Sequence, residues 1–135
     1  MGQAWIDFDV PDLAARIEQL SDAERDKLPF GVIHLDREGK VLFYSDTERR
    51  LSGNPDPPTG RNFYSQARCM GADIFRGRIQ RAQEDEGRVD FEVAWPSDYG
   101  GVKRELRIRV QSASDGGVWV CIQRDMVAVS GRSAA

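Results

Sequence analysis

The last third of the chain holds three consecutive segments in which apolar and polar residues alternate. They are RVDFEVAW (88–95), VKRELRIRV (102–110) and GVWVCIQR (117–124). Alternation places every second side chain on the same face of a strand, so each segment predicts a β-strand with one apolar face. Strands of this kind are typical of antiparallel sheets, in which the second face is solvated or covered by another element. The segments therefore predict an antiparallel three-stranded meander.

Two more β-rich segments lie in the first half of the chain. GVIHL (31–35) and KVLFY (40–44) flank DREG (36–39), in which Asp and Gly suit a tight hairpin turn. Between this hairpin and the meander we expect a short helix through DTERRL, capped by Asp46, and a longer helix over residues 72–85. Five antiparallel strands with helices inserted between the second and the third form an α+β arrangement, which is the layout of the PAS fold.

The N-terminal part of the chain predicts a small helical cap. Four apolar residues recur at the spacing of one helical face: Val10, Leu13, Ile17 and Leu20. Ser21 and Glu24 have the spacing of a capping box that begins a second short helix. The expected organisation is a helical cap over residues 1–27, a PAS core over 28–125 and a disordered tail over 126–135.

Composition argues against several classes of function. The 135 residues suit one domain, and 19 basic against 22 acidic residues leave no basic excess to neutralise the phosphates of a nucleic acid. No apolar run approaches the roughly 20 residues of a membrane span, and the N-terminus lacks a secretory signal, so we expect a cytoplasmic protein without a membrane partner. Two cysteines and the single histidine, His34, are too few for a disulfide scaffold or a histidine-rich metal site.

Several short motifs say more than the fold does. LPFG (28–31) leads into the first hairpin. Further motifs follow along the chain: GRNFY (60–64), ARC (67–69), FRGRI (75–79) and VWVCIQR (118–124). In this order, over about residues 8–124, the chain resembles the photoactive yellow protein family of small bacterial blue-light receptors. Departures from the family pattern include Asn54, which stands in place of an arginine that covers the chromophore, and Arg68, which stands in place of a proline.

The resemblance implies a chromophore and the residues that hold it. p-Coumaric acid (4-hydroxycinnamic acid) would be covalently bound as a thioester to Cys69, with its phenol end buried as an anion. Tyr44 and a protonated Glu48 would donate hydrogen bonds to this anion, and Ser52 would support Tyr44. Light would drive trans–cis isomerisation and Glu48 would give its proton to the phenolate. The cap would then loosen and signal to an unidentified downstream protein.

The residue types agree with this chemistry. Tyr44, Glu48 and Ser52 are spaced i, i+4, so Glu48 and Ser52 lie on one side if the chain turns helical just after Tyr44. A buried anion without donors is too costly, and a buried carboxyl can be such a donor because desolvation disfavours its charged form. Cys69 must react as a thiolate, which Arg68 or a nearby helix N-terminus would favour.

Other interpretations remain open at this point. A PAS module that has lost the pigment would bind another small ligand, or serve as a dimerisation and regulatory module. A small enzyme with Cys69 as its nucleophile has no histidine base near in sequence, so we expect no enzyme, and a monomer or weak dimer. Cys121 lies in mid-strand and is expected to be a buried small hydrophobe. Arg107 and Arg109 form either a solvated row or one that the acidic residues of the cap cover.

Overall fold

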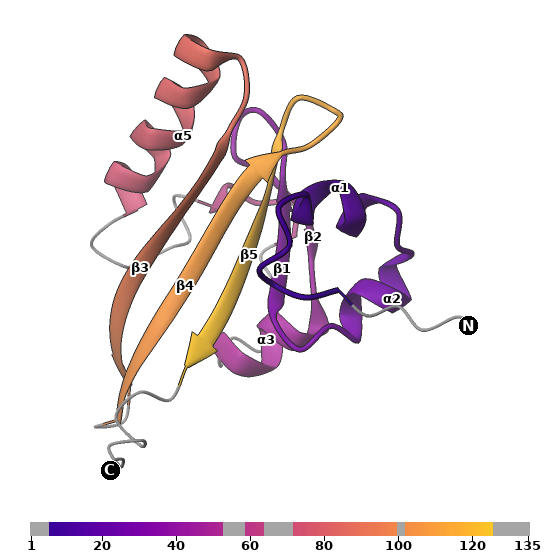
Figure 1. The fold of residues 1–135 in the computed structure, drawn as a ribbon, viewed down its shortest axis with the longest axis vertical. Coiled ribbons are helices and arrows are strands. Elements are labelled where there is room, and N and C mark those ends of the chain that lie inside the picture. The colour runs from indigo at the N-terminus through magenta and orange to yellow at the C-terminus, as the bar shows by residue number, and fades with distance from the viewer. Residues whose placement is uncertain (1–5, 53–58, 64–71, 100–101, 126–135) are drawn as a thin grey trace.

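A five-stranded sheet forms the centre of the protein, with helices packed on both of its faces (Figure 1). The computed structural model describes residues 6–52, 59–63, 72–99 and 102–125. The helices are α1 (Leu13–Glu18), α2 (Asp22–Asp26), α3 (Asp46–Ser52) and α5 (Ala72–Glu86). The strands are β1 (Gly31–Leu35), β2 (Val41–Tyr44), β3 (Asp90–Tyr99), β4 (Val102–Ser112) and β5 (Val118–Asp125).

The strands lie in the order β2-β1-β5-β4-β3, and every neighbouring pair is antiparallel. The predicted hairpin is β1–β2 and the predicted meander is β3–β4–β5. The two are joined through β1 and β5, so the first strand lies next to the last. This is the α+β architecture that the sequence predicts, with helices before the first strand and between the second and the third. The expected tail over 126–135 lies outside the described residues.

The hairpin of β3 and β4 is longer than the alternating pattern indicates. Its ladder continues from Trp95 opposite Leu106 to Tyr99 opposite Val102, and so passes through Pro96. A proline has no amide hydrogen to give to a ladder, and for this reason the sequence-based strand ends before it. Because β3 is the edge strand of the sheet, one side of Pro96 needs no partner and the strand continues.

Two hydrophobic clusters lie on opposite faces of the sheet. The cap-side cluster joins the N-terminal segment and its helix to the sheet: Ile6, Phe8, Leu13, Ala14, Ile17, Leu28, Phe30, Val32, Ala113, Trp119 and Cys121. The helix-side cluster packs α5 onto the other face: Ile33, Leu35, Val41, Ile79, Val89, Val110, Val118, Val120 and Ile122. Neighbours along β5 belong to different clusters, as its alternation predicts.

The polar row of β4 packs against the cap and is only partly exposed to solvent. Arg107 pairs with Asp9, and Arg109 donates to the carbonyl oxygens of Phe8 (2.8 Å) and Val10 (2.6 Å). Of the two interpretations of this row, the structure supports the one in which the cap covers it. Asp9 and Glu92 both hydrogen-bond Arg107 and raise the pKa of its guanidinium further above the ordinary value.

A second attachment of the cap surrounds Trp119. Glu18 accepts a hydrogen bond from Trp119 Nε1 (3.0 Å) and another from the amide of Ser114 (2.6 Å). Burial alone would raise the pKa of Glu18, but these hydrogen bonds lower it below its ordinary value. His34 stacks on the Trp119 ring at 4.2 Å between centroids, and the Arg25 guanidinium lies 4.8 Å from that ring. The cap is therefore held by charged and aromatic contacts as well as by its apolar face.

An irregularity in β2 decides where its last side chain points. His34 pairs with Phe43 but Leu35 pairs with Val41, so Leu42 is an extra residue of β2 without a partner in the β1–β2 register. Such a bulge reverses the alternation of faces along the strand. Leu42 is accordingly 43% exposed, and Tyr44 packs against the helix-side cluster. Alternation without the bulge would place Tyr44 on the face opposite Val41.

Candidate functional site

The site begins at the turn from β2 into α3, which Ser45 controls. The buried Ser45 hydroxyl oxygen accepts hydrogen bonds from the amides of Glu48 (3.2 Å) and Val32 (3.0 Å). A serine whose side chain accepts from the amide three residues later is an N-cap, so Ser45 caps α3. The prediction that Asp46 caps this helix is wrong. Both residue types suit the position, and the additional bond to β1 favours Ser45.

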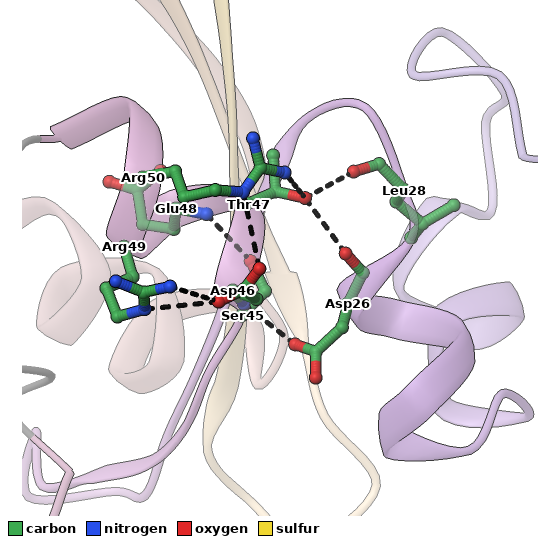
Figure 2. Close-up of polar contacts among 8 residues, drawn as sticks. All are labelled: Asp26, Leu28, Ser45, Asp46, Thr47, Glu48, Arg49 and Arg50. Carbon is green, nitrogen blue, oxygen red and sulfur yellow. Dashed lines mark hydrogen bonds and ion pairs between the residues drawn. The ribbon is translucent and has the colours of Figure 1, made fainter.

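Asp46 instead organises the exposed side of α3. Its carboxylate binds Arg49 (2.6 Å) and Arg50 (3.3 Å), one helical turn away, as Figure 2 shows. Both arginines therefore lie on the outer side of the helix. The hydrogen bonds from Arg49 and Arg50 lower the pKa of Asp46 below its ordinary value. Glu48 lies between these charged neighbours in sequence but points the other way, toward the sheet.

Glu48 is buried and forms a two-point ion pair with Arg124 of β5. Its side chain is 4% exposed and that of Arg124 is 13% exposed. Arg124 Nη1 lies 2.7 Å from Glu48 Oε1 and Nη2 lies 2.8 Å from Oε2, so both carboxylate oxygens are bound. A parallel pair of charged hydrogen bonds is the strongest arrangement that arginine and a carboxylate can form.

Gly31 makes room for this carboxylate at the start of β1. A Cβ atom at position 31 would lie 1.9 Å from Glu48 Oε1 and 2.9 Å from its Cδ. Only glycine therefore lets the Glu48 side chain lie against β1. The close approach of Glu48 explains why the motif LPFG ends in a glycine.

Reasoning from the sequence missed Arg124, although the alternation of β5 contains the signal. Val118, Val120 and Ile122 all belong to the helix-side cluster. Arg124 continues this phase, two residues beyond Ile122, and must face the same side of the sheet. A charged residue in phase with an apolar face needs a buried partner of opposite charge, and the structure supplies Glu48.

Tyr44 also interacts electrostatically with Arg124. These two side chains and that of Glu48 define the site. Burial opposes the charge of Arg124, but the hydrogen bonds and charge of Glu48, with the electrostatic effect of Tyr44, raise the pKa of the guanidinium. Tyr44 is opposite Ile33 in the β1–β2 ladder and therefore faces the helix side of the sheet. We call Tyr44, Glu48 and Arg124 the α3 site. Two of its members are residues that the sequence predicts.

The other predicted site residues cannot be placed with these three. Cys69 lies outside the described residues, as do Asn54 and Arg68. Ser52 is the last residue of α3, and its side chain is outside the described part of the chain. The roles that the resemblance gives to Cys69 and Ser52 stay predictions.

Cys121 can be placed and is unsuited to the same role. It is buried in mid-strand in the cap-side cluster, on the face of β5 opposite Arg124. Burial raises the pKa of its thiol far above the ordinary value, although the charge of Arg109 opposes this. A thiol that does not ionise is a poor nucleophile, and it does not take up the acyl group of an activated ester. The structure thus supports the interpretation of Cys121 as a packing residue.

A direct hydrogen-bonded connection links the α3 site to the end of the cap. The buried hydroxyl of Thr47, next to Glu48 in α3, shares its one hydrogen between the carbonyl oxygens of Leu28 (2.7 Å) and Asp26 (3.0 Å) (Figure 2). The amide of Asp46 donates to the Asp26 carboxylate at 2.7 Å. Because Asp26 ends α2, a movement of α3 acts directly on the last helix of the cap.

One hollow on the described surface lies away from this site. It has a volume of about 160 Å³ and is bounded by the β1–β2 turn at Asp36 and by α5 at Ile79 and Gln83. The α3 site lies at the other end of β1, beside Gly31. No side chain of the α3 site lines this hollow. It therefore does not mark the place where the predicted chromophore would lie.

Known proteins similar to this chain are photoactive yellow proteins. That of Halochromatium salexigens is 27% identical over 122 residues, which cover 88% of this chain and 97% of the relative. That of Cereibacter sphaeroides is 29% identical over 119 residues, with 86% and 92% covered. No protein-family model matches the chain.

Solved structures support the same relationship. The photoactive yellow protein domain of the sensor histidine kinase Ppr from Rhodospirillum centenum is 31% identical, with 82% of this chain and 98% of that chain covered and a TM-score of 0.69. The PAS domain of the quorum-sensing receptor RpfR from Cronobacter turicensis has a TM-score of 0.57 at 14% identity, which shows the fold alone. These comparisons confirm the PAS fold.

Among the described residues, no helix is long and apolar enough to cross a membrane. The photoreceptors of the related family are not enzymes, in agreement with the expectation from the sequence.

From the near-complete coverage of the relatives and the shared PAS architecture, we conclude that this chain belongs to the photoactive yellow protein family.

Proposed function

We propose that the protein is a blue-light receptor in which p-coumaric acid is bound as a thioester to Cys69. Family membership is the first support, because it brings the expectation of a chromophore. The described site residues fit the phenol end of such a group: Tyr44 has a hydroxyl donor, Glu48 a carboxyl, and Arg124 a positive charge. Groups of this kind are what a buried phenolate requires.

The burial of Glu48 is the single observation that carries the proposal. Glu48 is 3% exposed, whereas its neighbour Arg50 is exposed. Carboxylates are almost never fully buried unless they are paired, and Glu48 is held inside the fold by its pair with Arg124. A buried carboxyl that can be neutral or ionised is suited to hold and release a proton beside a ligand.

The proposed mechanism gives roles to Tyr44, Glu48 and Thr47. The chromophore, when bound, would supply light absorption and trans–cis isomerisation. Tyr44 and a protonated Glu48 would hold the anionic phenol end in the dark. After light, Glu48 would give its proton to the phenolate oxygen, and α3 would transmit the change to the end of α2 through the Thr47 hydrogen bonds. The loosened cap then signals to a downstream protein, with the receptor acting as a monomer or weak dimer.

A second candidate function has one observation in its favour. Both oxygens of Glu48 are already bound by Arg124, so the charges of these two side chains balance without a chromophore. A PAS module that binds another small ligand, or that regulates by dimerisation, would be compatible with this pairing. The two functions differ in whether Cys69 accepts a coumaroyl group.

The proposed function is tested by supplying the purified protein with activated p-coumaric acid and measuring its mass and absorption. We expect the mass to rise by one coumaroyl group, a visible band to form, and that band to bleach reversibly in blue light. Cys69→Ala should stay colourless, and Cys121→Ala should become yellow. Equal loss of pigment in both variants would contradict the assignment of Cys69. A folded wild-type protein without added mass would favour the pigment-free module.

A further inference from the structure

We propose that Arg124 determines the charge state of the bound chromophore: it keeps Glu48 ionised in the empty site, and it is the counter-ion of the phenolate in the filled one. This inference rests on the proposed function and extends it to a residue that the sequence-based site does not contain. Its basis is the buried, two-point ion pair of Arg124 and Glu48.

The geometry makes Glu48 the base of the empty site. Each of its oxygens accepts a hydrogen bond from a different nitrogen of the Arg124 guanidinium, at 2.7 and 2.8 Å. A guanidinium is always charged and has no lone pair to offer, so it stabilises the carboxylate and not the carboxylic acid. The site therefore holds one positive and one negative charge before any ligand arrives.

A phenol that enters this site can ionise without any exchange of protons with water. Its O–H bond breaks as its proton moves to an oxygen of Glu48, which gives a phenolate and a neutral carboxylic acid. The new O–H group of Glu48 donates back to the phenolate, which is the dark arrangement that the family resemblance implies. The total charge of phenol, Glu48 and Arg124 is zero before and after the transfer, because the proton moves only within the site. Arg124 changes its partner from the carboxylate to the phenolate.

Removing the positive charge changes this balance. Without Arg124, the phenolate and neutral Glu48 together are a buried net charge of minus one, which a low-dielectric site disfavours. The site then takes up a proton from solvent, and the phenol becomes neutral. The groups that face one another are Tyr44 from β2, Glu48 from α3 and Arg124 from β5, and the β4 residue opposite Arg124 is the apolar Leu106. Among these described residues, Arg124 is the only cation.

The test is a pH titration of the visible band in chromophore-loaded wild-type protein and in Arg124→Gln. We expect the midpoint at which the yellow band is lost to rise by at least one pH unit in Arg124→Gln, a tenfold fall in the ratio of phenolate to phenol. Arg124→Lys keeps the charge and should recover at least half of the shift. Arg88→Gln removes the same formal charge from an exposed residue, paired with Asp90, and should leave the midpoint unchanged.

A second pair of variants covers the case in which Arg124→Gln does not fold, because it leaves Glu48 buried and unpaired. Glu48→Gln alone and Glu48→Gln with Arg124→Gln both avoid an unpaired carboxylate. The double variant should titrate at least one pH unit higher than the single one. Loaded proteins with equal midpoints would overturn the role of Arg124 and leave the proposed function intact. A wild-type protein that gains no coumaroyl mass would overturn the proposed function, and this inference with it.

Discussion

Gly31 is the residue on which the position of the Glu48 carboxylate depends. A methyl group at this position would overlap with Oε1 of Glu48, which is one of the two oxygens that bind Arg124. The sequence could predict a buried Glu48 from helical spacing. It could not predict Gly31 or Arg124 as neighbours of Glu48, because only the fold brings β1 and β5 next to α3.

We therefore expect Gly31→Ala to destabilise the protein by about 1–3 kcal/mol, the usual cost of overpacking a close-packed site. The measurement is urea unfolding followed by circular dichroism. Gly77→Ala is the matched control, because a Cβ atom at this position of α5 meets nothing within 4 Å, and alanine is the better helix former. Equal stability losses in the two variants would show that Gly31 does not position Glu48.

Helix α3 is the element that connects the site to the cap. Its inner side carries Glu48, its N-terminus is capped by Ser45, and Thr47 bonds the last residues of the cap (Figure 2). The sequence indicated a short helix here but not its connection to Asp26, since hydrogen bonds to backbone carbonyls leave no pattern in the residue types. The sequence also does not indicate the bulge at Leu42, which turns Tyr44 toward the site, because the bulge lies in the pairing of β2 with β1 and leaves no pattern in the residue types.

Thr47→Val should weaken this connection with almost no change of shape. The valine leaves the carbonyl oxygens of Asp26 and Leu28 without their donor, at a cost of about 1–3 kcal/mol for unsatisfied buried groups. We expect faster amide hydrogen exchange in α2 and up to Leu28, while β4 and β5 keep their protection. Ser112→Ala removes a hydroxyl that accepts from Val89 near the opposite end of the sheet, and should not affect α2. Unchanged exchange in α2 would rule out Thr47 as the connection.

At the scale of the whole molecule, the cap and the α3 site lie on opposite faces of the sheet. A signal between them must pass around the sheet through α3 or through the strands. The first route is the shorter, because α3 contacts the end of α2 directly. Alternation predicted both faces of β4 and β5 correctly. The sequence could not decide what covers the polar row of β4, because that depends on where the N-terminal segment packs.

Within the cap, α2 is the helix with the fewest buried contacts. Helix α1 has six residues and α2 has five, and α2 buries none of its own side chains. Short segments with few buried contacts open locally at a small fraction of the global unfolding free energy. When Glu48 gives its proton to the phenolate, Arg124 must change its partner from the phenolate back to the Glu48 carboxylate. We expect this exchange of partners to move Glu48 within α3, and so to act on the neighbouring α2 through Thr47.

Hydrogen exchange of the pigmented protein, in the dark and under blue light, tests the central claim that light at the α3 site releases the cap. We expect illumination to speed exchange first in residues 6–27 and in residues 44–52, while β4 and β5 stay protected. The unpigmented protein under the same light should show no change. Identical exchange in dark and light, or a first change in β4 and β5, would contradict cap release through α3.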